Sequence, residues 1–127
     1  MYNIKEMARK TGLPAPTLRF YEKEGILPFV KRDEHGNRLY DENDLEWLDF
    51  ILALRATGMP LRDIKQYVDL YQEGDGTFAA RRQMMMNHKL QIEEQIANLY
   101  KYLDKINYKL ALYDILKSEA PKHEIKI

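Results

Sequence analysis

The side chains of this sequence that could do chemistry are cations rather than nucleophiles or metal ligands. The 127 residues include 20 Lys and Arg and no Cys, and the histidines are far apart: His35, His88 and His123. With no thiol, no His–carboxylate spacing and no glycine-rich phosphate loop, nothing supplies a nucleophile together with its base. We therefore expect no enzyme, metal site, thiol switch or cofactor, and we expect all three histidines to be ordinary surface residues.

The first 40 residues carry an excess of positive charge that could bind a polyanion. Residues 1–40 carry eight Lys and Arg against five Asp and Glu, residues 41–76 carry three against nine, and residues 77–127 carry nine against six. The net charge of the chain is zero, but a nucleic acid responds to a local patch rather than to a total. The first 40 residues are therefore the candidate DNA surface.

Two short helices are expected to position these cations. Asn3 and Glu6 form a capping-box pattern ahead of a helix over 4–11, which Gly12 ends. A proline-containing turn over 13–17 then leads into a second helix that continues through residue 24.

The spacing within these helices is typical of a helix-turn-helix. Ala8 is small enough for close helix packing, Gly12 makes the turn, and Leu18 anchors the second helix while its other face stays free for a major groove. Downstream, extended runs at 26–30 and 38–40 flank a turn over 33–37, which predicts a small hairpin. Together these features predict a mainly α, winged helix-turn-helix fold.

The second half is expected to be helical throughout. A third helix begins after Asp41 and stops at Gly58, and a fourth starts at Pro60. After a break at 74–76, residues 77–120 contain no Gly or Pro, so they fit one helix of about 66 Å.

Heptad spacing along this long helix predicts dimerisation through a coiled coil. The alternative is a hairpin of two shorter helices, but no turn signal interrupts the segment. The predicted seam consists of Ile92, Ile96, Leu99, Leu103, Ile106, Leu110 and Tyr113.

Four stretches of this sequence resemble the MerR family of bacterial transcription regulators. They are Thr11-Gly12-Leu13; the segment 17–27, with its Arg-Phe-Tyr-Glu; the wing 32–40, with its Gly-x-Arg-x-Tyr; and the segment 55–61. The resemblance implies a winged helix-turn-helix DNA-binding domain over 1–73, a dimerisation helix over 77–120 and a short tail over 121–127.

The resemblance also implies which residues contact DNA. Thr17 and Arg19 match recognition-helix positions, and an Arg suits guanine or phosphate. Tyr21 matches a phosphate-contacting tyrosine, although its ring could also be core. Wing and backbone contacts are implied for Arg32, Arg38, Tyr40 and Arg55.

Each assignment has a structural alternative. Arg19 could instead pair with Glu22 or Asp33 on the surface. For the wing and backbone residues the alternative is solvated charge or packing of the hairpin.

The implied partners are double-stranded promoter DNA, a second copy of the chain and, at the promoter, RNA polymerase. The family distorts the DNA so that an overlong promoter spacer becomes readable. The rival class is a coiled-coil interaction or assembly protein with a DNA-binding-like front half. No apolar run approaches the length of a membrane span and no signal region begins the chain, so we expect a cytoplasmic protein without membrane contact.

The composition restricts which effectors a member of this family with this sequence could sense. Without cysteines, metal or thiol sensing by the route of many members is excluded, and the tail after residue 120 leaves no room for a separate drug-sensing domain. We predict instead a small organic effector, apolar or cationic, where the fourth helix meets the long helix of the partner copy, near Tyr67, Tyr71, Met85 and Tyr100, unless these side chains close a solid core.

Overall fold

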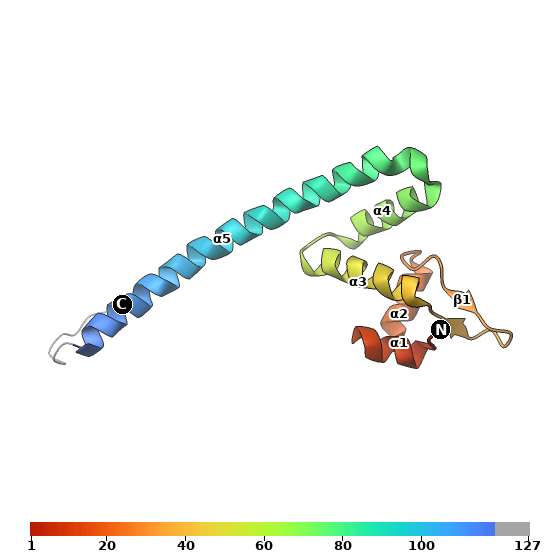
Figure 1. The fold of residues 1–127 in the computed structure, drawn as a ribbon, viewed down its shortest axis with the longest axis horizontal. Helices are drawn as coiled ribbons and strands as arrows, with labels where there is room; N and C mark the ends of the chain where they lie inside the picture. Colours follow the sequence, from red (N-terminus) through yellow and green to blue (C-terminus); the bar gives the residue numbers. More distant parts are fainter. Residues whose placement is uncertain (119–127) are drawn as a thin grey trace. The chain divides into compact units, whose positions relative to one another are not determined.

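The computed structural model describes residues 1–118 as two units, Met1–Met85 and a second unit that begins at Met86 (Figure 1). The predicted tail at 121–127 lies outside the described residues. The first unit contains α1, α2, the β1–β2 hairpin, α3 and α4, and it includes the first turns of α5. The second unit is formed by the rest of α5.

The helix-turn-helix forms as the local signals predict. α1 spans Ile4–Thr11, and the Asn3 side chain accepts from the Glu6 N–H while the Glu6 carboxylate accepts from the Asn3 N–H. Gly12 takes the left-handed conformation (φ 73°) that ends the helix. α2 follows over Ala15–Lys23. Both helices are held by fully buried side chains, Met7 on α1 and Leu18 on α2.

The wing is a short antiparallel hairpin. β1 (Lys31–Arg32) pairs with β2 (Arg38–Leu39), so that Arg32 lies opposite Arg38. One carboxylate oxygen of Asp33 accepts from the His35 N–H at 2.9 Å and from the Asn37 N–H at 2.8 Å, which fixes the turn between the strands.

The expected extended run at 26–30 is wrong. Those residues form turns, and the first strand begins only at Lys31. Ile26 and Leu27 are almost completely buried, so their apolar side chains enter the core instead of alternating across a strand.

α3 spans Glu42–Ala56 and α4 spans Leu61–Glu73. Asp41 caps α3 in a second reciprocal capping box with Asp44. These helices complete a single core, in which each fully buried aliphatic side chain contributes about 1.5–3 kcal/mol. Its buried apolar members are Met7, Leu18, Tyr21, Ile26, Leu27, Tyr40, Leu48, Ile51, Leu54, Met59, Ile64 and Val68.

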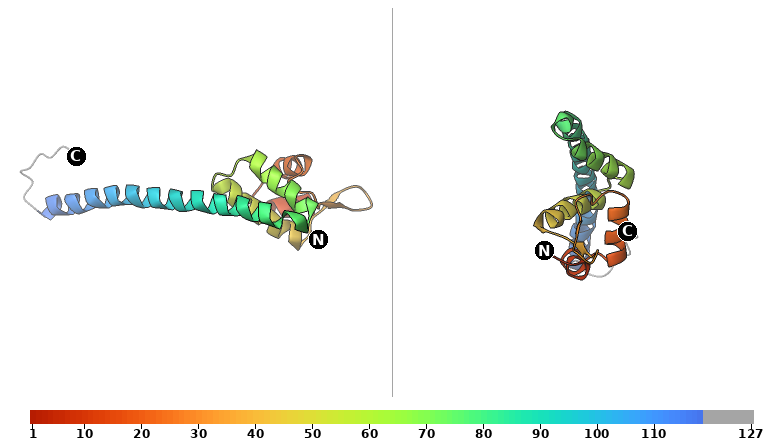
Figure 2. Two further views of the ribbon diagram at one scale, coloured as in Figure 1. Left: turned by 90° about the horizontal axis from the view of Figure 1, so that it is seen from above. Right: turned by 90° about the vertical axis from the view of Figure 1, so that its right-hand side faces the viewer.

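A 3₁₀ turn, η1 (Asp75–Thr77), occupies the predicted break, and α5 spans Phe78–Ser118 as one continuous helix of 41 residues (Figure 2). The single long helix is therefore confirmed through residue 118, and the alternative hairpin of two shorter helices is wrong.

Candidate nucleic-acid interface

α2 presents an outer face that is free to contact a ligand. Leu18 and Tyr21, three residues apart, anchor its inner face, whereas Arg19 and Phe20 are exposed. Thr17, at the start of the helix, is half-buried. Among the described residues, no hydrogen bond or ion pair engages the Arg19 guanidinium. The alternative in which Arg19 pairs with nearby carboxylates is wrong.

The Glu22 carboxylate binds both wing arginines instead. One of its oxygens accepts from Arg32 Nη2 at 3.2 Å, and the other accepts from Arg38 Nε. Arg32 Nη1 also donates to the Gly36 carbonyl oxygen at 2.9 Å. We call these three residues, Glu22, Arg32 and Arg38, the wing latch, because they tie both strands of the wing to α2.

Arg19 and the wing face a common hollow of about 450 Å³. Lys5 on α1 also lines this hollow, so it joins Arg19 and Arg38 in a cationic surface. Lys5 was not predicted from the sequence, because a lysine near the start of a short helix carries no local signal of its neighbours. The complete lining is Asn3, Ile4, Lys5, Arg19, Asp33, Gly36, Asn37, Arg38 and Leu39.

Both tyrosines that were predicted to contact DNA are buried. Tyr40 is completely buried and its hydroxyl has no hydrogen-bond partner, so its side chain is packed in the core and is not presented to a DNA phosphate. Burial, followed by the nearby Glu22 carboxylate, raises the pKa of Tyr40. The ring of Tyr21 is also buried, with 8% of the residue exposed.

Replacing each tyrosine by Phe separates these roles. Tyr40→Phe removes an unpartnered hydroxyl, so DNA affinity should not change and the free energy of unfolding should stay equal or rise by up to about 1 kcal/mol. If Tyr21 donates to a phosphate, Tyr21→Phe should weaken DNA binding about fivefold, since a hydrogen bond to a charged group is lost. Anisotropy titration and thermal melting measure the two effects. A large loss of affinity in Tyr40→Phe would mean that its hydroxyl reaches DNA after all.

Arg55 lies at the other end of α3 from the wing (Figure 1), on an exposed position. It is fourteen positions along the chain from Asp41, and at 1.5 Å per residue this is about 21 Å. A DNA contact by Arg55 would therefore be separate from those of the wing.

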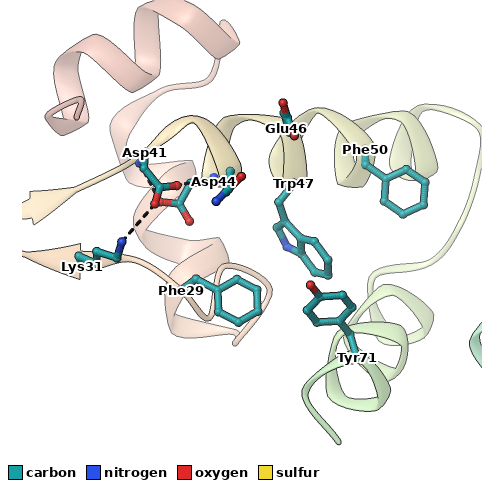
Figure 3. Close-up of a pocket in the computed structure, with 9 residues that line it drawn as sticks. Phe29, Lys31, Asp41, Asp44, Glu46, Trp47, Phe50 and Tyr71 are labelled. Carbon is teal, nitrogen blue, oxygen red and sulfur yellow. Dashed lines mark hydrogen bonds and ion pairs between the residues drawn. The ribbon is translucent and has the colours of Figure 1, made fainter. Parts of the chain in front are cut away.

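An open groove of about 650 Å³ lies beside α3 and α4 (Figure 3). The ring centroids of Trp47 and Tyr71 are 4.8 Å apart, and Phe29 lies 5.8 Å from each of them. The indole N–H of Trp47 donates to the Ile26 carbonyl at 2.8 Å, which fixes the ring. The lining residues are Phe29, Lys31, Asp41, Asn43, Asp44, Glu46, Trp47, Phe50 and Tyr71.

Carboxylates form the polar side of this groove. Asp41 pairs with Lys31 at 3.2 Å, whereas Asp44 is buried and forms no ion pair among the described residues. Burial raises the pKa of Asp44, and the hydrogen bond from the Asp44 N–H lowers the pKa of Asp41.

Two of the predicted effector residues contact one ring within this chain. Tyr67 stacks on Trp47 with centroids 6.3 Å apart, and Tyr71 contacts the same ring. Met85 packs against the core, and Tyr100 is exposed and 15 residues farther along α5. Trp47 was not predicted as a site residue, although its spacing of three from Phe50 places both on one face of α3.

The expectation that all histidines are surface residues is wrong for His88, which is only 5% exposed. Within residues 1–118, no three His, Asp or Glu side chains form a group that could hold a metal ion.

Two family profiles match the sequence of this chain. The profile described as "MerR HTH family regulatory protein" matches residues 2–70, which include both helices and the wing, and the profile "MerR, DNA binding" matches residues 45–108. The chain belongs to the MerR family. The resemblance inferred from the motifs is thereby confirmed.

Individual MerR relatives agree in sequence and in fold. An uncharacterized HTH-type transcriptional regulator of Haemophilus influenzae is 44% identical over 92% of this chain and 87% of its own. The regulator AdhR of Bacillus subtilis is 39% identical over 72% of this chain and 66% of its own. The crystal structure of HiNmlR, "a MerR family regulator lacking the sensor domain, bound to promoter DNA", has a TM-score of 0.84 at 44% identity, covering 92% of this chain and 93% of that one.

The long helix of this MerR-family chain carries an apolar seam. Ile92 is half-buried, and the other six predicted seam residues are 47–65% exposed in the single chain. An exposed apolar row of this length on one helix is typical of an interaction surface. In the described part of the chain, no helix is both long and apolar enough to cross a bilayer.

Proposed function

We propose that this protein is a sequence-specific DNA-binding transcription regulator that acts as a homodimer on promoter DNA. The observation that carries the proposal is Arg19, an exposed and unpaired cation on a helix whose opposite face is anchored in the core. A relative of the same fold, HiNmlR, is bound to promoter DNA in its crystal structure. The relatives are regulators rather than enzymes, and a cytoplasmic location fits that role.

In this proposal α2 lies in a major groove, with Thr17 and Arg19 toward the bases. The wing residues Arg32 and Arg38 contact the backbone or minor groove, and Arg55 contacts a more distant phosphate. Two copies joined along the seam would place their recognition helices about 34 Å apart, one turn of B-DNA.

The regulatory step in this proposal is a change in the shape of DNA. A dimer that bends or untwists the promoter spacer alters its alignment for RNA polymerase, and the deformation costs on the order of 1–6 kcal/mol that the protein contacts must offset. The family resemblance supports this mechanism.

DNA binding is tested by selecting duplexes from genomic fragments with the purified protein and titrating the recovered duplex at several salt concentrations. Affinity should fall steeply as salt rises, because each neutralised phosphate releases counterions. A scrambled duplex of equal length is the control. An assembly protein would recover no enriched sequence and would show no salt-dependent binding, and that result would contradict the proposal.

We further propose that the aromatic groove, beside the predicted effector residues Tyr67 and Tyr71, receives a small organic effector. Exposed rings of Phe29 and Phe50 offer π faces, and the exposed Glu46, which forms no ion pair among the described residues, adds a carboxylate to the lining. Both features favour an organic cation, with about 0.5–2 kcal/mol from each cation–π contact.

The groove contains its own reporter, because Trp47 is the only tryptophan in the chain. Titration with benzyltrimethylammonium should change its fluorescence saturably, whereas benzyl alcohol, a neutral aromatic, should have little effect. Tyr71→Ala should weaken the response, and Tyr100→Ala should leave it unchanged. A linear, unsaturable response, or equal responses to both compounds, would show that the groove does not bind organic cations.

A further inference from the structure

We propose that Glu22 determines how well the protein distinguishes its promoter site from other DNA, by holding the two wing arginines in place before DNA binds. This inference rests on the proposed DNA-binding function. It concerns a carboxylate that would not itself contact DNA, so Glu22 is a positioning residue.

The geometry of the wing latch supports this role. Glu22 uses one oxygen for each arginine, and the two arginines come from different strands of the hairpin. Arg32 is held a second time by the Gly36 carbonyl. Only about a fifth of the Glu22 side chain is exposed, and about a quarter of that of Arg38. Partial burial reduces the screening that weakens fully exposed pairs.

The latched arginines keep donors for DNA. A guanidinium has five N–H donors; the hydrogen bonds observed occupy two nitrogens of Arg32 and only Nε of Arg38. The wing latch therefore fixes the position of each guanidinium and leaves some of its N–H donors free to bind DNA. A phosphate at the matching position can bind without moving the wing.

The wing latch should increase specificity because it restricts the movement of the two wing arginines. Arginines on a free wing can rotate toward any phosphate, which strengthens binding to every sequence. Held by Glu22, they reach only phosphates that lie at the correct distance from α2. A site whose bases engage Arg19 meets this condition, whereas an arbitrary duplex does not.

A role of Glu22 through its charge alone predicts a different change in DNA affinities. If Glu22 were only a negative charge near the phosphates, its removal would tighten binding to all DNA by the same factor. Glu24 provides the matched control: it lies one position beyond the end of the same helix, carries the same charge and forms no ion pair among residues 1–118.

The experiment compares Glu22→Gln with Glu24→Gln and the unaltered protein. Affinity is measured for the selected duplex and for a scrambled duplex of equal length, across a series of salt concentrations. In Glu22→Gln the scrambled duplex should bind more tightly and the selected one should not, so the ratio of affinities should fall about three- to tenfold. The salt slope for the scrambled duplex should steepen by about one to two, because two arginines are released. Glu24→Gln should keep the ratio.

Glu22→Asp extends the test, since it keeps the charge but shortens the reach to Arg32 and Arg38. It should lower the ratio as Glu22→Gln does. Equal tightening of both duplexes in Glu22→Gln, or an unchanged ratio in Glu22→Asp, would overturn the positioning role. Failure of the unaltered protein to prefer any duplex would instead contradict the proposed function, so the two failures are distinguishable.

Discussion

Replacing Leu103 by Asp is expected to separate the dimer and to abolish operator binding. Leu103 lies in the middle of the seam and is 47% exposed in the single chain, so the substitution should not disturb the first unit. In a dimer it would bury an unpaired carboxylate in each copy, at a cost of about 3–5 kcal/mol for each. Each released monomer would hold only one half-site, and losing the link between half-sites lowers affinity by about 10²–10⁴-fold.

Sedimentation and anisotropy titration measure the two consequences. Tyr108→Asp is the matched control, because Tyr108 is 67% exposed on the same helix and lies off the seam, two residues from Ile106 and from Leu110. It should remain a dimer and bind the operator. An intact Leu103→Asp dimer would contradict the heptad assignment.

Replacing Arg19 by Ala is expected to weaken specific DNA binding by about 1–3 kcal/mol while the fold stays intact. Arg19 is exposed and makes no hydrogen bond or ion pair in the described chain, so its removal leaves no group unsatisfied and should not change the melting temperature. Normal operator binding by the variant would contradict the recognition-helix assignment.

Two further variants test which kind of contact Arg19 makes with DNA. Arg19→Lys keeps the charge but loses the bidentate fork, so it should retain affinity if Arg19 binds phosphate and lose it if Arg19 reads guanine. Arg9→Ala removes a cation of the same type from an exposed position of α1 outside the hollow, and should have a much smaller effect.

Features that depend on neighbours within a few turns were predictable from the sequence. The Asn3–Glu6 and Asp41–Asp44 boxes both form and start their helices where expected. Gly12 ends α1, and the stretch without Gly or Pro after the break is one helix. These signals work because capping, turn conformation and helix continuity are short-range properties of the backbone.

Which side chains contact one another could be established only from the tertiary structure. Glu22 meets arginines 10 and 16 positions away, Trp47 meets Tyr71 from another helix, and Lys5 shares a hollow with Arg19. No periodicity indicates such pairs, since each depends on where two separate elements cross.

Burial was likewise decided by the fold. The extended run expected at 26–30 became turns that place Ile26 and Leu27 in the core, and Tyr40, expected at the DNA backbone, is fully enclosed. The sequence by itself determined the helices, the turn of the wing and the apolar seam, because local backbone preferences and periodic burial are encoded by adjacent residues. Only the tertiary structure decided that Arg19 is free while Arg32 and Arg38 are held, because one carboxylate can satisfy only the cations that the packed elements bring within hydrogen-bonding distance.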